Sequence, residues 1–211
     1  LNHHRDEYNR FDSAAIGRRR LKNVCLSYLT ADESQEGLTL ATQQFESTTT
    51  MTDRVAALTL LVNSSAIEKE ACLSSFYEQW KDDVLVVGKW FAIQAMSNQP
   101  GTLDRVKALL EHSAFDIRMP NLVRSVIGAF TQSNPVQFHQ KDGSGYRFLA
   151  DHVIELNAIN PQIASRMLTP LTAWSRFDLD RQHIMKSELQ RVMKANDISP
   201  DVYEVASKAL A

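Results

Sequence analysis

The segment KDGSGYRFLADH, residues 141–152, has two glycines around a serine, a composition that phosphate-binding loops also have. A dinucleotide-binding loop needs the pattern G-x-G-x-x-G directly after a strand. Here Gly143 and Gly145 are followed by Phe148 at the third glycine position, and no strand pattern precedes them. The Gly-Lys-Ser/Thr of a P-loop is absent as well. We therefore predict a turn at Asp142 and Gly143 that leads into a helix.

Histidine and cysteine residues do not form a recognisable catalytic or metal-binding pattern. None of the six histidines is followed by glutamate, so the H-E-x-x-H motif of zinc peptidases cannot occur. His152 and Glu155 share a helical face, but two ligands make no metal site, and a solvated or ion-paired couple is the better interpretation. Cys25 and Cys72 lie in apolar segments and are expected to be reduced, buried thiols. We predict no catalytic residue, no metal ligand and no cofactor in this chain.

Gln162 and Arg166 in the sequence NPQIASRM are one helical turn apart on one predicted face. With Asn160 as N-cap, they lie near a helix N-terminus, where free N–H groups and the helix dipole favour an anion. Arg166 gains nothing from the dipole there, but it could bind a carboxylate through two charge-assisted hydrogen bonds. Alternatively, Arg166 is a surface residue paired with Asp151 or Glu155, and the residues alone favour this second interpretation.

The sequence GRRRLKN, residues 17–23, is the main basic cluster. Apolar residues interleave with the charges, so we expect the arginines and the lysine on the solvated outer side of an amphipathic helix. The opposite stripe of that helix contains Ile16, Leu21, Val24, Cys25 and Tyr28. A nucleic-acid-binding patch is the alternative interpretation, and nothing else in the chain extends it.

The totals describe a globular protein of 211 residues with a formal charge of −2. This charge gives no overall attraction to nucleic acid or to an anionic membrane, so we expect neither as a partner. No run reaches the roughly 20 apolar residues that span a bilayer, and residues 1–10 are too polar for a signal peptide. These features and the two cysteines lead us to expect a cytoplasmic protein.

The periodicity of the chain is helical nearly everywhere. We expect Thr52 or Asp53 to cap the helix in TDRVAALTLLV, and Thr102 to cap the helix in LDRVKALLEH. The segment DDVLVVGKWFAIQAM, residues 82–96, is predicted as helix in spite of the run from Val84 to Val87, which resembles a strand. Five prolines are expected at first helical positions: Pro120, Pro135, Pro161, Pro170 and Pro200.

This pattern predicts an all-α fold in which antiparallel helix pairs stack in a curved, HEAT/armadillo-like superhelical layer. Residues 1–211 are expected to form a single helical domain. No exact repeat period is visible in the sequence.

Several segments together resemble the C-terminal helical domain of bacterial aminopeptidase N, an alanyl aminopeptidase of the gluzincin class of zinc metallopeptidases. They are RRRLKNVCLSYL, MTDRVAALTLLV, GKWFAIQAM, FDIRMPNLVRSVIGAF, NPVQFHQKDGSGYRFLADHVIELNAINPQIASRM and YEVASKALA. The resemblance runs from about Ile16 to Ala211, and its most specific part is Phe115–Met167. The zinc motif and the Gly-Ala-Met-Glu-Asn motif of the family's catalytic domain are absent from this chain.

The resemblance implies a non-catalytic domain that closes over the catalytic domain of the same polypeptide and forms an internal chamber for short peptides. It also implies that Arg124, Gln162 and Arg166 face this chamber and bind the peptide substrate. With the resemblance included, Arg166 is therefore expected to bind substrate and not to be only a paired surface residue. The zinc of the parent hydrolase would be held by the catalytic domain. The family's helical domain is longer than this chain, so we expect an N-terminal truncation that starts inside a helix at residues 1–11.

Two other classes of function stay open at this point. An independent helical-repeat scaffold that binds protein partners would explain the helices but not the NPQIASRM sequence. A nucleic-acid binder centred on residues 18–22 would show salt-sensitive retention of DNA or RNA, and the net charge of −2 makes it the weakest alternative.

Overall fold

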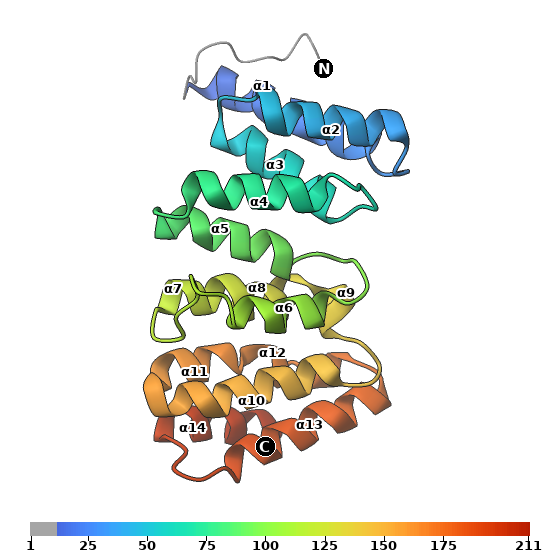
Figure 1. Cartoon of the computed structure of the whole chain (residues 1–211). Helices are drawn as coiled ribbons and strands as arrows, with labels where there is room; N and C mark the ends of the chain where they lie inside the picture. Colours follow the sequence, from blue (N-terminus) through green and yellow to red (C-terminus); the bar gives the residue numbers. More distant parts are fainter. Residues whose placement is uncertain (1–11) are drawn as a thin grey trace. The chain divides into compact units, whose positions relative to one another are not determined.

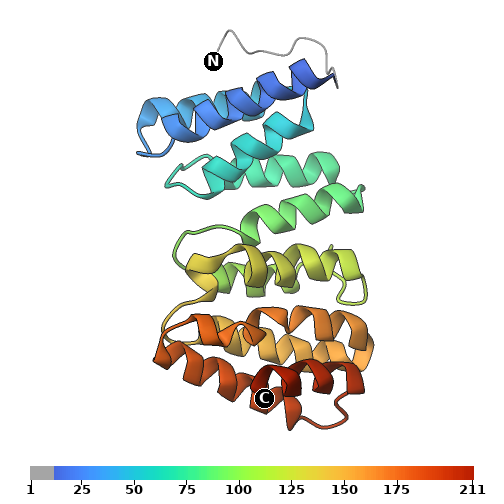
Figure 2. The same cartoon turned by 180° about the vertical axis from the view of Figure 1, so that it is seen from behind.

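The computed structural model describes residues 12–211, and within this range every regular element is a helix (Figures 1 and 2). The predicted all-α class is therefore confirmed for the described residues. Contacts divide the chain into two compact units, one ending at Gln99 and one running from Pro100 to Ala211. The prediction that residues 1–211 form one domain stays a prediction. The helix expected at residues 1–11 lies outside the described residues.

The first unit contains five helices, α1 to α5, which run back and forth beside one another (Figure 1). Helix α3 is central, since it packs against each of the other four. Its buried residues Ala57, Leu58 and Leu61 form much of the core of this unit. The bounds are Ser13–Leu29 for α1, Gln35–Ser47 for α2, Met51–Val62 for α3, Lys69–Trp80 for α4 and Val84–Ala95 for α5.

The second unit is built from shorter helices around α10 and α13. Helix α10 packs against α11 and α13, and α14 packs against α11 and α13. The bounds are Thr102–Leu110 for α6, Pro120–Val123 for α7, Arg124–Gly128 for the π-helical turn η2, Ala129–Ser133 for α8, Pro135–Phe138 for α9, Ser144–Ile159 for α10, Pro161–Met167 for α11, Thr169–Thr172 for α12, Trp174–Arg176 for the 3₁₀ turn η3, Leu179–Met193 for α13 and Pro200–Leu210 for α14.

Helix starts were predicted well where proline follows a capping residue. Asn134, Asn160 and Ser199 each accept a backbone hydrogen bond at the start of a helix whose first residue is proline. Pro170 is the second residue of α12, not the first. Two predicted caps were wrong: Thr50 caps α3, and the left-handed Gly101 precedes α6, in which Thr102 is already helical.

The glycines of the KDGSG segment have structural roles, as the predicted turn requires. Gly143 adopts a left-handed conformation with φ of 71°, which a residue with a side chain adopts only with strain. Gly145 lies inside α10, and a Cβ atom there would be 2.2 Å from the carbonyl oxygen of Phe138. The predicted turn and helix are thus confirmed, because the two glycines let the chain reverse and α10 approach α9 closely.

The predicted orientation of α1 was wrong. The apolar residues Ile16, Leu21, Val24 and Tyr28 are 44–78% exposed, whereas Arg19 and Lys22 are at most 9% exposed. Lys22 forms an ion pair with Asp53 of α3, which is itself only 2% exposed. This pair replaces the apolar contact that periodicity predicts, so the basic cluster is not simply a solvated face.

A polar cluster joins α9, α10 and α13. The His139 Nδ1 atom is 2.9 Å from the hydroxyl of Tyr146, and Arg181 Nε donates a 2.9 Å hydrogen bond to the carbonyl oxygen of His139. Burial, and to a smaller extent the charge of Arg181, lowers the pKa of His139. Burial raises the pKa of Tyr146. The uncharged forms of both side chains are therefore favoured inside this cluster.

Candidate functional site

Two of the three predicted substrate-binding residues lie in one cavity of the second unit. Arg124 of η2 and Arg166 of α11 both line this cavity, which has a volume of about 440 Å³. We call it the two-arginine cavity. Its other lining residues are Gly128, Ala129, Gln132, Ser133, Met167 and Thr169.

A π-helical turn places Arg124 at the edge of the cavity. The turn interrupts the helical segment between α7 and α8, and such insertions occur often at functional sites. Val126 and Ile127 are fully buried and hold the turn against the core, while Arg124 is exposed. Gly128 lies one turn further along, where a Cβ atom would contact Met167 Sδ at 3.7 Å. The absent side chain keeps the space beside Arg124 open.

The short helix α11 presents Gln162 and Arg166 to solvent. Asn160 caps this helix, and its buried residues Ile163, Ala164 and Met167 face the core. Because α11 has only seven residues, Arg166 lies in its last turn and not near its N-terminus as predicted. The helix dipole favours a cation at the C-terminal end of a helix, so the prediction that Arg166 gains nothing from the dipole is wrong.

The electrostatic environment of the cavity is positive, because two guanidinium groups and no carboxylate line it. Arg124 Nη1 donates a 3.1 Å hydrogen bond to Asn121 Oδ1, and this neutral partner leaves its charge unbalanced. Arg166 makes no ion pair with any residue in the range 12–211. The alternative pairing with Asp151 is not found, since Asp151 pairs with Arg191 at 2.7 Å. Arrangements of this kind suit a carboxylate or a row of carbonyl oxygens.

Gln162 does not line the cavity, although it is exposed one turn before Arg166 on α11. Gln132, Ser133 and Thr169 add polar groups to the cavity that sequence reasoning missed. Gln132 could have been predicted from the sequence, because it follows Arg124 by eight residues, which is about two helical turns and places both residues on the same side of the helical segment.

In the part of the chain that the structure describes, no group of three or more His, Cys, Asp or Glu residues could hold a metal ion. His152 forms no ion pair with Glu155; its Nδ1 atom is 2.7 Å from the carbonyl oxygen of Phe148. Within residues 12–211, no helix is both long enough and apolar enough to cross a membrane.

Comparison with known proteins relates the whole chain to one family. The family described as "Domain of unknown function (DUF3458_C) ARM repeats" matches residues 1–211. Aminopeptidase N of Escherichia coli is 39% identical over 208 residues, which are 99% of this chain and 24% of that protein. Aminopeptidase N of Caulobacter vibrioides is 38% identical over 199 residues, which are 94% of this chain and 23% of that protein.

A solved structure supports the same relation. The crystal structure of Legionella pneumophila aminopeptidase A in complex with aspartic acid matches with a TM-score of 0.89 and 35% identity, over 98% of this chain and 24% of that one. The chain thus spans about a quarter of the length of the relatives it matches. The predicted resemblance to aminopeptidase N is confirmed, and the ARM-repeat description agrees with the predicted armadillo-like class. The chain therefore belongs to the DUF3458_C family of ARM-repeat domains and corresponds to a domain of aminopeptidase N-like proteins.

Proposed function

We propose that this chain is the non-catalytic C-terminal domain of a cytoplasmic zinc aminopeptidase, and that it binds part of the peptide substrate. In this proposal, the zinc site and the catalytic residues belong to another domain of the same polypeptide. The helical domain closes over that domain and forms a chamber that admits short peptides. The observation that carries the proposal is the pair Arg124 and Arg166, which share a cavity without a neutralising carboxylate.

The two arginines bind the carboxylate or the carbonyl oxygens of the peptide beyond the scissile bond. Arg166 has the larger role, because it makes no ion pair among the described residues, whereas Arg124 already donates to Asn121. Gln162, one turn before Arg166, contributes hydrogen bonds to longer peptides. None of these groups takes part in bond cleavage, so their effect is on binding and orientation.

The exposed apolar face of α1 supports contact with another protein surface. Ile16, Val24 and Tyr28 are 44–78% exposed, and a surface of this kind marks an interaction site. We assign it to the domain interface of the parent polypeptide. The 211-residue chain alone is then expected to self-associate at high concentration, and replacing Tyr28 and Val24 by lysine is expected to abolish this. A monodisperse monomer by light scattering would contradict the assignment.

The binding role is tested in a full-length aminopeptidase that contains this domain. Arg166→Ala is expected to lower kcat/KM for tripeptides and tetrapeptides about tenfold, which corresponds to about 1.4 kcal/mol, and to spare a small alanyl chromogenic amide. The matched control is Arg176→Ala, which removes an exposed arginine of η3 outside the cavity.

A second comparison identifies the group that is bound. Amidation of the peptide C-terminus is expected to reduce kcat/KM in the wild-type enzyme and to have little effect in the Arg166→Ala variant, because the charge partner is then already missing. Equal kinetics of wild type and Arg166→Ala on all peptides would show that Arg166 is only a surface arginine. In that case the domain contributes shape and stability but no substrate contact.

A further inference from the structure

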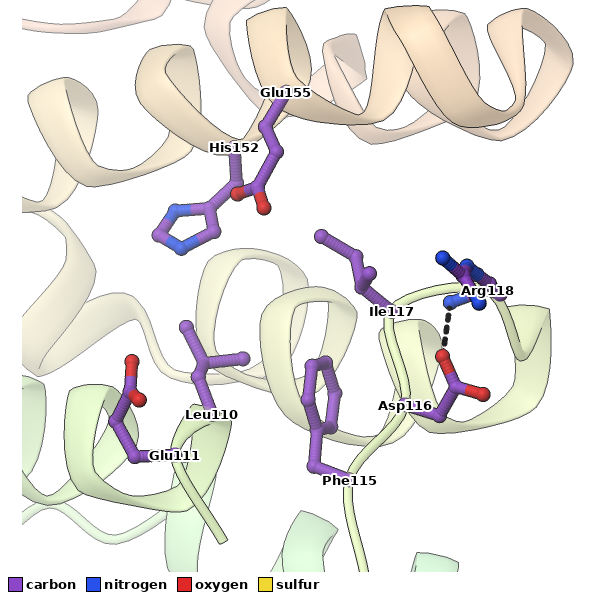
Figure 3. A pocket seen from close by; sticks show the side chains of 8 residues that line it. All are labelled: Leu110, Glu111, Phe115, Asp116, Ile117, Arg118, His152 and Glu155. Atoms are coloured by element: carbon purple, nitrogen blue, oxygen red, sulfur yellow. Dashed lines mark hydrogen bonds between the residues drawn. The ribbon is translucent and has the colours of Figure 1, made fainter. Parts of the chain in front are cut away.

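A second cavity of the second unit lies between the loop after α6 and the middle of α10 (Figure 3). It has a volume of about 370 Å³ and shares no lining residue with the two-arginine cavity. Its lining residues are Leu110, Glu111, Phe115, Asp116, Ile117, Arg118, His152 and Glu155. We call it the α6–α10 cavity. The proposed aminopeptidase function does not use it.

Apolar side chains form one wall of the α6–α10 cavity. Leu110, Phe115 and Ile117 are half-buried, and Figure 3 shows them pointing toward the side chains of α10. A wall of this kind can cover a short hydrocarbon chain of a ligand. The cavity is open to solvent, so it suits a small group and not a fully enclosed molecule.

Two exposed carboxylates at the cavity have no partner among the described residues: Glu155 faces the apolar wall from α10, and Glu111 lies beside Leu110 on the side of that wall (Figure 3). Neither Glu111 nor Glu155 makes an ion pair or a hydrogen bond through its side chain with any residue in the range 12–211. Asp116 differs, because its Oδ1 atom accepts a 2.9 Å hydrogen bond from the backbone N–H of Arg118 (Figure 3). The carboxylates available to a ligand are therefore those of Glu111, at the end of α6, and Glu155, on α10.

His152 adds an acceptor to the same cavity. Its Nδ1 atom is 2.7 Å from the carbonyl oxygen of Phe148, so Nδ1 carries the proton and donates. In the neutral ring, Nε2 is then a hydrogen-bond acceptor. Arg118 is the only cation among the lining residues. Figure 3 shows Glu111 and Arg118 on opposite sides of the view, and Glu155 above them beside His152.

The geometry points to a binding site for a small organic cation with a short apolar chain, such as a primary alkylamine, in the α6–α10 cavity. The ammonium group is held by Glu155 with the Nε2 atom of His152 as a further acceptor, and Glu111, across the cavity, adds a second negative charge. The hydrocarbon chain lies along Phe115, Ile117 and Leu110. The same chemistry occurs in free amines and in the side chain of lysine.

The test uses the 211-residue chain and three matched probes: n-pentylamine, pentan-1-ol and pentanoate. Binding is followed by the NMR signals of the Ile117 methyl groups and the His152 ring. We expect saturable shifts with pentylammonium at a Kd on the order of 1 mM, weaker shifts with the alcohol and none with pentanoate. Stronger binding of pentanoate would overturn the inference, because Arg118 would then determine the ligand. The absence of shifts with all three probes would overturn it as well.

Variants separate this site from general charge attraction. Glu155→Gln and Glu111→Gln are each expected to weaken pentylammonium binding about threefold, whereas Arg118→Gln is expected to strengthen it about twofold. Glu204→Gln is the charge-matched control, since Glu204 is an exposed carboxylate of α14 outside the cavity. Equal weakening by Glu204→Gln and Glu155→Gln would refute a specific site.

The source of the cation is identified with two further ligands. Acetyl-lysine-amide, which has a free side-chain amine, is compared with acetyl-norleucine-amide, which has none. Stronger binding of the lysine derivative than of pentylammonium would assign the site to a peptide side chain. Weaker binding would assign it to free amines. These measurements involve no peptidase activity, so their outcome is independent of the test of Arg166.

Discussion

Breaking the buried ion pair between Lys22 and Asp53 on one side only is expected to destabilise the first unit strongly. Asp53 is 2% exposed, and its Oδ1 atom also accepts a 2.9 Å hydrogen bond from Asn23 Nδ2. The Lys22→Met variant removes the cation but leaves the carboxylate in its buried position. Breaking a buried pair in this way typically costs about 3–5 kcal/mol, because the remaining charge is not compensated.

We expect the free energy of unfolding to decrease by about 3 kcal/mol, near the lower limit of this range, because the hydrogen bond from Asn23 still compensates part of the charge of Asp53. For a chain of 211 residues that unfolds in one transition, each kcal/mol changes Tm by about 2–4 °C, so the chain should unfold about 6–12 °C lower. Arg20→Met is the matched control, since it also removes one positive charge from α1 but at an exposed position. Its effect is expected to stay within about 0.5 kcal/mol.

The assay is thermal and urea unfolding of both variants, followed by circular dichroism. The double variant Lys22→Met with Asp53→Asn is expected to regain most of the lost stability, because neither charge is then buried alone. Equal stability of Lys22→Met and Arg20→Met would refute the argument, since the lysine would then contribute no more than a surface charge. A double variant as unstable as Lys22→Met would place the loss in packing and not in charge.

Three further predictions follow from glycine contacts, histidine burial and thiol burial. Gly145→Ala is expected to destabilise the chain by about 2 kcal/mol or more, because its Cβ atom would overlap a backbone carbonyl group. Gly17→Ala is the control: its Cβ atom would meet no atom within 4 Å, so it should stabilise α1 by up to about 1 kcal/mol in the same urea assay. Burial lowers the pKa of His139 in the folded state, so the unfolded state binds more protons as the pH falls. The urea midpoint should therefore be highest above the ordinary histidine pKa of about 6.5 and decrease below it. The variant His139→Gln should flatten this pH dependence. Burial raises the pKa of Cys72 to about 11, so at about pH 8 a disulfide reagent should modify the half-buried Cys25 before Cys72. Equal rates of modification of the two cysteines in the native chain would contradict this prediction.

Local sequence signals determined most of the secondary structure. The pairs of a capping residue and a proline marked the starts of α9, α11 and α14, since both effects act within one helical turn. Helical spacing also identified α5 in spite of its valine-rich run. The absence of a complete phosphate-loop pattern was visible from the residues alone.

Only the tertiary structure decided which face of each helix is buried and which side chains meet. Periodicity predicted that the apolar stripe of α1 faces the core. Instead, Lys22 is buried in an ion pair with Asp53 of α3. No local sequence signal predicts an ion pair between residues 31 positions apart. For the same reason, only the tertiary structure shows that Arg124 of η2 and Arg166 of α11, predicted as one site by resemblance alone, line the same cavity. The contacts that position charges are long-range, whereas the rules that predict helices are short-range.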